Sequence, residues 1–247
     1  MRTTHILHAE LDKLLTLPAI KLTFWGTLLV NLVLTAAFTA AGLQESTGTQ
    51  HILETGLASI GYIQAGFIIL GVLATCSEYT GGQIRTTLTV TPWRGLQLST
   101  KHVALALLTI PMALIISASG VLYSFIMMQD TAAAMETGTV IQTVLGAIGY
   151  LTLTTLLSAA IGALLKRTTP ALVILLGYYF IAGPFAKGLL TSGQAYFPDT
   201  AGSSMYTPPS PVVMDGALSP LQGAGVLLLW TLLFIGVAIV FYRRRDA

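Results

Sequence analysis

Charged residues are scarce in this chain. Asp, Glu, Lys and Arg make up 9% of its 247 residues, whereas apolar residues make up 54% and the mean hydropathy is +0.77. A soluble domain carries about 25% charged residues. We therefore expect most of the chain to lie in a lipid bilayer rather than in water.

Several common site motifs are also missing. The single Cys76 excludes an internal disulfide and a Cys-x-x-Cys metal site. The chain has no GxxxxGK[ST] phosphate loop, no GxGxxG fingerprint, no His-Glu-x-x-His motif and no Gly-x-Ser-x-Gly elbow. We interpret His5, His8 and Glu10 as the polar face of a helix rather than as metal ligands. We expect no cofactor on this chain, and any ATP that it uses would be bound by another chain.

Most of the chain consists of long runs without Asp, Glu, Lys or Arg. A bilayer core of ~30 Å needs about 20 apolar helical residues, and a helix satisfies its own backbone hydrogen bonds in lipid. We therefore predict an all-α polytopic membrane protein, a single transmembrane domain over 1–247. The predicted membrane helices are 22–44, 55–77, 102–129, 137–165, 168–188 and 220–242. Gly177, Gly183 and Pro184 indicate that the fifth helix is broken or ends inside the membrane.

The distribution of Lys and Arg predicts the orientation. With a cytoplasmic N-terminus, eleven of the twelve basic residues lie inside and only Lys187 lies outside. This favours a multi-pass protein of the cytoplasmic (cell) membrane with both termini in the cytoplasm. Residues 189–219 are rich in Pro, Gly, Ser and Thr, and we predict an extracellular loop there. The loop either contains short interfacial or re-entrant pieces or forms a mobile tether.

Residues 1–21 are predicted to form an amphipathic helix on the inner membrane surface. Pro18 is expected to stop or kink it. The alternative is a cytoplasmic extension of the first membrane helix. The expected apolar face consists of Ile6, Leu7, Leu11, Leu14 and Leu15.

The segment 78–101 is too polar for hydrocarbon and too apolar for a free linker. Gly81 and Gly82 allow a sharp turn, and Pro92 cannot continue a helix. Ile84 and Leu88 lie on one helical face between these points. We predict a short cytoplasmic coupling helix between the second and third membrane helices. Glu78 is expected to pair with Arg85 or Arg94. Arg94 and Lys101 are expected to lie near anionic headgroups. The alternative is that they are ordinary positive charges flanking the membrane on the inside.

The pattern in this segment resembles the ABC-2 type permeases, the membrane subunits of one class of ATP-binding-cassette exporters. The string Ser-Glu-Tyr-Thr-Gly-Gly-Gln-Ile-Arg-Thr-Thr-Leu is especially similar to permeases of high-GC Gram-positive bacteria, although Gly82-Gln83 replaces the usual Gly-Thr. The resemblance implies a coupling helix seated in a cleft of a separate ATPase subunit, which holds ATP and Mg. It also implies a second permease copy as partner, and no nucleic acid. The residues assigned to coupling are Glu78, Gly82, Ile84, Arg85, Leu88, Pro92, Arg94 and Lys101.

The expected function is export of a peptide, drug or lipid-like substrate, without enzymatic activity on this chain. Tyr62, Gln64, Tyr178 and Tyr179 are candidates to line the translocation path, with packing or interface anchoring as the alternative. An intramembrane enzyme would need a nucleophile with a base, or paired acids, at membrane depth, and the sequence offers neither. An ATPase-independent assembly factor or sensor is the other alternative.

Overall fold

The computed structural model describes residues 3–45, 52–80, 94–128, 137–189, 193–207 and 218–244. These residues form helices and turns, with no β-strand among them. Six helical segments are long and apolar enough to cross a membrane. They are Pro18–Leu43, Ile52–Tyr79, Gly95–Met127, Thr137–Leu165, Thr168–Leu189 and Pro220–Tyr242. The prediction of an all-α polytopic membrane protein is confirmed.

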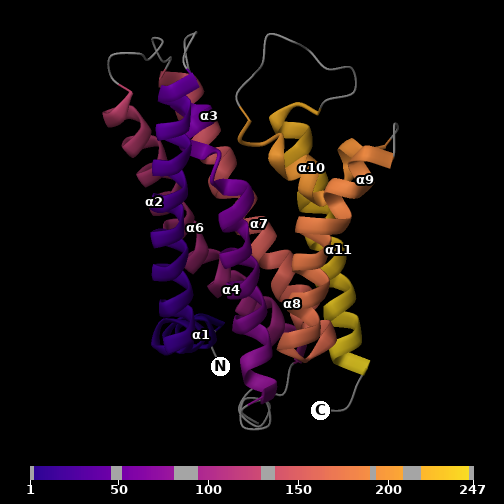
Figure 1. Ribbon diagram of the computed structural model, residues 1–247. Coiled ribbons are helices and arrows are strands. Elements are labelled where there is room, and N and C mark those ends of the chain that lie inside the picture. The colour runs from indigo at the N-terminus through magenta and orange to yellow at the C-terminus, as the bar shows by residue number, and fades with distance from the viewer. Residues whose placement is uncertain are drawn as a thin grey trace.

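The helices form one upright bundle (Figure 1). Their order is α1 Thr3–Thr16, α2 Pro18–Glu45, α3 Ile52–Leu57, α4 Ile60–Thr80, α6 Arg94–Met127, α7 Thr137–Leu165, α8 Thr168–Gly177, η1 Tyr178–Ala182, α9 Gly183–Leu189, η2 Gln194–Tyr196, α10 Pro198–Ser203 and α11 Pro220–Arg244. Helix α1 and the last turn of α11 lie at one end of the bundle, which we call the α1 end. Helix α10 lies at the opposite end, the α10 end.

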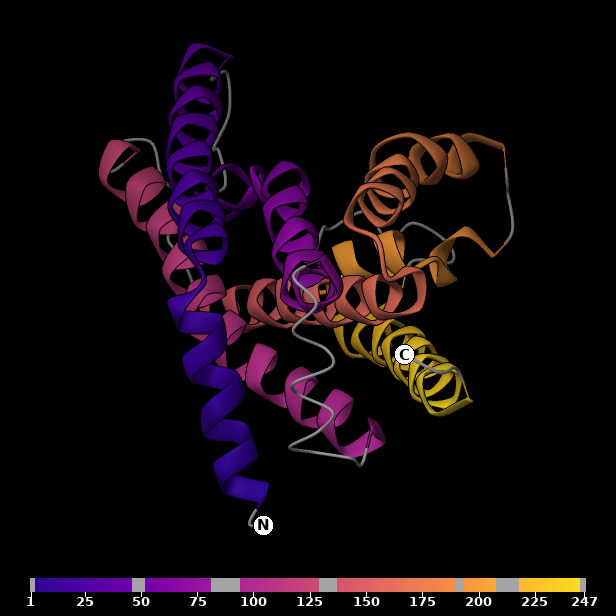
Figure 2. The ribbon, with the colours of Figure 1, turned by 90° about the horizontal axis from the view of Figure 1, so that it is seen from below.

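Helix α7 is the centre of the bundle, with α4, α6 and α11 packed around it (Figure 2). Small residues at its crossings allow close helix approach. A Cβ on Gly71 of α4 would lie 2.3 Å from the Thr155 carbonyl oxygen of α7, and one on Gly162 would lie 2.5 Å from Thr75 Oγ1. Dispersion contacts at such crossings hold helices together in lipid, where the hydrophobic effect does not.

Helix α1 is separate from the first membrane helix. It ends at Thr16, and α2 begins at Pro18 after a break at Leu17, so the alternative of one continuous helix is wrong. Figure 2 shows α1 lying across the α1 end rather than along the bundle. Leu14 is buried, but Leu15 is half-exposed and does not belong to the packed face that the sequence predicts.

The second membrane segment consists of two helices rather than one. Helix α3 ends at Leu57 and α4 begins at Ile60. Ser59 in the break donates a hydrogen bond to Asn31 Oδ1 of α2 at 2.7 Å, and Asn31 Nδ2 donates to the Ile116 carbonyl of α6 at 3.1 Å. The break therefore places a polar group where a buried asparagine needs a partner.

The fifth membrane segment is interrupted, as its glycines and proline predict. The α-helix α8 widens into the π-helix η1 directly before Gly183 and Pro184. Proline has no backbone N–H, and its ring crowds the carbonyl four residues earlier. A π-bulge is one way in which a helix accommodates the lost hydrogen bond and the crowded carbonyl.

The described part of the predicted loop 189–219 is folded against the bundle. Residues 193–207 contain η2 and α10, with Asp199 and Ala201 buried. A Cβ on Gly146 of α7 would lie 1.8 Å from the Met205 carbonyl oxygen, so this segment packs directly on the central helix. These residues therefore form short helical pieces that pack on the bundle.

Candidate functional site

Four charged side chains meet at the α1 end and form what we call the charge cluster: Glu10, Lys13, Glu78 and Lys101. Glu10 and Lys13 lie on α1, Glu78 in the last turn of α4, and Lys101 in the second turn of α6. Lys13 Nζ lies 2.5 Å from Glu78 Oε1 and 3.3 Å from Glu10 Oε1. Lys101 Nζ lies 2.6 Å from Glu78 Oε1 and 3.4 Å from Glu10 Oε2. Each lysine thus contacts both carboxylates, and the cluster joins three helices.

Most of the charge cluster is removed from solvent. The side chains of Glu10, Glu78 and Lys101 are 4–5% exposed, and that of Lys13 is 32% exposed. Two carboxylates and two ammonium groups sum to zero net charge. Buried ions are tolerated when they are paired in this way, whereas removal of one partner leaves an uncompensated buried charge. The four groups therefore act as a unit.

The apolar packing of α1 explains why Glu10 is buried. Ile6, Glu10 and Leu14 recur every four residues and therefore share one helical face. Ile6 and Leu14 are buried, and Leu14 packs with Leu70 of α4 and Leu105 of α6. Because Ile6 and Leu14 pack in the interior, Glu10 between them on the same face is buried as well. Our interpretation of Glu10 as part of a polar surface is wrong for this reason, although His5 and His8 are exposed.

Lys13 stays charged at neutral pH. Partial burial by itself would lower the pKa of the Lys13 ammonium, because burial disfavours the charged form. The hydrogen bond and charge attraction of Glu78, together with those of Glu10, outweigh burial and raise that pKa above its ordinary value.

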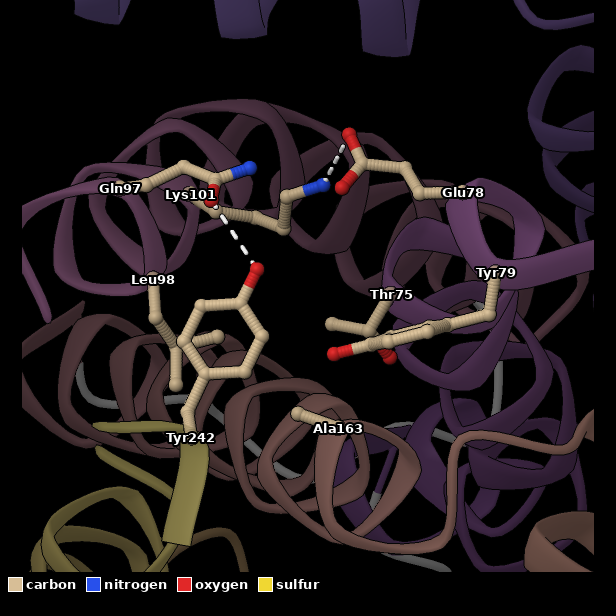
Figure 3. Close-up of a pocket in the computed structure, with 8 residues that line it drawn as sticks. All are labelled: Thr75, Glu78, Tyr79, Gln97, Leu98, Lys101, Ala163 and Tyr242. Atoms are coloured by element: carbon tan, nitrogen blue, oxygen red, sulfur yellow. Dashed lines mark hydrogen bonds and ion pairs between the residues drawn. The ribbon is translucent and has the colours of Figure 1, made fainter. Parts of the chain in front are cut away.

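A small pocket lies beside the charge cluster (Figure 3), with room for about one water molecule. Glu78 and Lys101 form one side of it, and Tyr79 and Tyr242 face each other across it. The Tyr242 hydroxyl donates to Gln97 Oε1 at 3.0 Å. Gln97 lies one turn before Lys101 on α6, so the same helix face binds α11 through Gln97 and α4 through Lys101.

The start of α8 is connected to the same region. The Lys166 ammonium lies 5.5 Å from the centre of the Tyr79 ring, a cation–π distance. Lys166 has φ +57°, the left-handed conformation that ends α7 before α8 begins. Side chains at the α1 end thus connect α1, α4, α6, α11 and the α7–α8 turn.

The structure brings together two of the residues predicted to couple, Glu78 and Lys101. Glu78 pairs with Lys13 and Lys101. Lys101 is buried within α6, so our prediction that it lies near lipid headgroups is wrong. Both borders of the predicted loop 78–101 are helical, since α4 continues to Thr80 and α6 begins at Arg94. The remaining predicted coupling residues Gly82, Ile84, Arg85, Leu88 and Pro92 and the side chain of Arg94 lie outside the described residues.

Sequence reasoning missed Glu10 and Lys13 as members of the site. The signal was present, because Glu10 interrupts an apolar stripe at helical spacing and Lys13 follows three residues later. A charge within a packed face needs a partner. What the sequence did not supply was the identity of that partner, 65 residues away from Lys13.

The four candidates for a translocation path make different contacts. Gln64 is buried and accepts a hydrogen bond from the Tyr150 hydroxyl of α7. The Tyr178 hydroxyl donates to Asp199 Oδ1 at 3.2 Å, and Tyr179 is buried beside Tyr178. Tyr62 is 55% exposed and lines a separate groove between α2 and α4. Gln64 and Tyr179 are packed in the interior, whereas Tyr62 lies at the surface of the bundle.

Neither a protein-family model nor a curated protein sequence matches this chain.

Proposed function

We propose that this protein is the membrane subunit of an ATP-binding-cassette exporter, with the α1 end in the cytoplasm. In this proposal a separate ATPase subunit binds the part of the predicted coupling segment 78–101 that lies between α4 and α6, residues 81–93. The motion that follows ATP binding then passes into the bundle. A second copy of the membrane subunit completes the transporter, and a peptide, drug or lipid-like substrate moves outward. ATP and Mg are bound by the partner.

The observation that carries the proposal is the charge cluster. Glu78 lies three residues before the segment 81–93, and Lys101 lies eight residues after it. The 2.6 Å contact between them ties together the two helices that border this segment. Glu10 and Lys13 add α1 to the same unit. A force applied to residues 81–93 would therefore reach α1, α4 and α6 together rather than bend one helix alone.

The position of the basic residues supports a cytoplasmic α1 end. Lys13, Lys21, Lys101 and Lys166 lie on segments at this end, whereas Lys187 lies on α9 toward the other. Lys and Arg are retained on the cytoplasmic side of membrane proteins. An ATPase subunit would meet the bundle on that side.

Affinity purification tests the proposed partnership. The tagged chain is purified from its native membrane after mild cross-linking, and co-purified proteins are identified by mass spectrometry. We expect an ATP-binding-cassette ATPase. Leu88→Asp should abolish most of its recovery, because a charge without a partner in a protein cleft costs several kcal/mol. Thr207→Asp is the matched control, an exposed residue at the α10 end.

Two outcomes of the purification would contradict the proposal. One is recovery of no ATPase with the parent chain. The other is equal recovery with Leu88→Asp and with Thr207→Asp, which would show that residues 81–93 are not the docking element. ATP turnover by the purified chain without a partner would also be inconsistent with a subunit that has no phosphate loop.

A further inference from the structure

A groove of about 300 Å³ runs between α2 and α4 on the outer face of the bundle. Its volume lies at the lower limit for ligand sites, which are about 300–1,000 Å³. Helix α2 contributes Thr23, Gly26, Thr27 and Val30, and α4 contributes residues from Tyr62 to Ile69, including Ala65. Each wall spans seven residue steps, so the groove is about 10 Å long at 1.5 Å per helical residue.

The chemistry of the lining suits an apolar ligand. Thr27 Oγ1 donates to the Thr23 carbonyl at 2.7 Å, and Thr23 Oγ1 donates to the Ala19 carbonyl at 2.8 Å. Neither threonine hydroxyl has a hydrogen left for a ligand. The ring of Tyr62 contacts Phe38 at a centroid distance of 5.9 Å and forms an aromatic wall.

The groove opens toward lipid. Both walls belong to segments that are long and apolar enough to span a membrane. The surrounding surface of α2 is apolar and exposed, with Leu29 at 65% and Val33 at 60%. Lys21 and Trp25 are exposed at the α1 end of α2, and such residues mark the membrane interface. Gly26 to Val30, which follow Trp25 along α2, therefore lie in the leaflet at the α1 end.

We propose that this groove is a binding site for one acyl chain of a lipid from that leaflet. An α-helix with its side chains is about 10–12 Å across, so a groove of this volume admits side-chain ridges of a second copy but not a helix. An extended hydrocarbon chain is thinner and fills the space along its length. The site is independent of the proposed transport function.

The glycines show how the groove is formed. A Cβ on Gly66 would lie 2.0 Å from Thr27 Oγ1, so α2 and α4 touch at this crossing. A Cβ on Gly26 would meet nothing within 4 Å, although Gly26 also lines the groove. Because Gly26 has no side chain, the α2 wall of the groove keeps open space beside the close contact of the two helices at Gly66.

Photo-cross-linking tests the site. The full chain is reconstituted in vesicles that contain a phospholipid with a diazirine in its acyl chain, and labelled peptides are mapped after illumination. We expect residues 23–30 and 62–69 to be labelled several-fold more than the exposed face of α11 at Leu229 and Leu232. Gly26→Leu should lower labelling of 62–69 by about tenfold, because its side chain takes the place of methylene groups that each add to affinity.

Matched variants distinguish groove filling from misfolding. Ala65→Leu fills the groove from the opposite wall and should lower labelling of 23–30. Gly236→Leu on α11 is the control, because a Cβ there also meets nothing within 4 Å and the residue is exposed. Equal labelling of all exposed helices, or unchanged labelling in Gly26→Leu, would overturn the proposal. So would a disulfide between two Gly26→Cys copies in a Cys76→Ser background, because a second copy would then cover the groove.

Discussion

Both ends of the bundle bury carboxylates, two at the α1 end and one at the α10 end, but they neutralise them in different ways. At the α1 end, Glu78 contacts Lys13 and Lys101, and Glu10 completes the cluster. At the α10 end, Asp199 contacts Lys187 at 2.9 Å and accepts a hydrogen bond from Tyr178. Both arrangements hold a helix that lies outside the membrane segments, α1 in one case and α10 in the other.

The difference lies in access to water and in the number of elements joined. The Lys101 side chain is 4% exposed, so it depends on protein carboxylates for its charge balance. The Lys187 side chain is 36% exposed and can be solvated when its partner is lost. The charge cluster joins three helices that are far apart in the sequence. Asp199 joins α10 only to α9 and η1, which lie shortly before it in the chain. The α1 end should therefore fail as a unit, and the α10 end should loosen locally.

Loss of Glu78 should have the largest effect. In Glu78→Ala, both lysines lose the nearer of their two carboxylate partners, and Lys101 remains buried. We expect a loss of about 3–5 kcal/mol in the free energy of unfolding. Denaturant unfolding in detergent micelles measures this. Glu54→Ala is the control, because Glu54 is an exposed acid on α3. Equal stability of the two variants would show that the charge cluster contributes nothing to the bundle.

Loss of Asp199 should cost less and act locally. Asp199→Ala removes a charged hydrogen-bond acceptor, which is worth about 1.5–3 kcal/mol, while water can solvate Lys187. We expect limited proteolysis within 193–207 to increase before the bundle unfolds. Asp199→Asn should retain the Tyr178 hydrogen bond and show a smaller increase. Global unfolding as severe as that of Glu78→Ala would remove the distinction between the two ends.

Loss of Lys13 should have the smallest effect, with a characteristic pH dependence. Lys13→Met leaves Glu78 paired with Lys101, so we expect a loss of about 1 kcal/mol at pH 7. Because the pKa of Lys13 is raised in the folded chain, its contribution is complete below its ordinary pKa of 10.5 and is lost as the pH rises through the folded value. The stability difference between parent and Lys13→Met should therefore be constant from pH 7 to 10 and shrink above 10.5. A difference that grows with pH would contradict the sign of this coupling.

Sequence alone determined the number and approximate position of the membrane helices. That prediction depends on the composition of continuous runs and on a bilayer thickness that is the same for every protein. Local chemistry also indicated the interruption near Gly183 and Pro184 and the separation of α1 from α2 at Pro18.

Tertiary structure decided which groups meet. The four members of the charge cluster come from three segments, and nothing near Glu78 in the sequence identifies Lys13 as its partner. Composition does not indicate which face of a helix touches another. The uncharged runs therefore predicted neither the break between α3 and α4 nor the burial of Asn31. Helix length follows from local sequence and the bilayer, whereas the pairing of Glu78 with Lys13 and Lys101 follows from how α1, α4 and α6 pack.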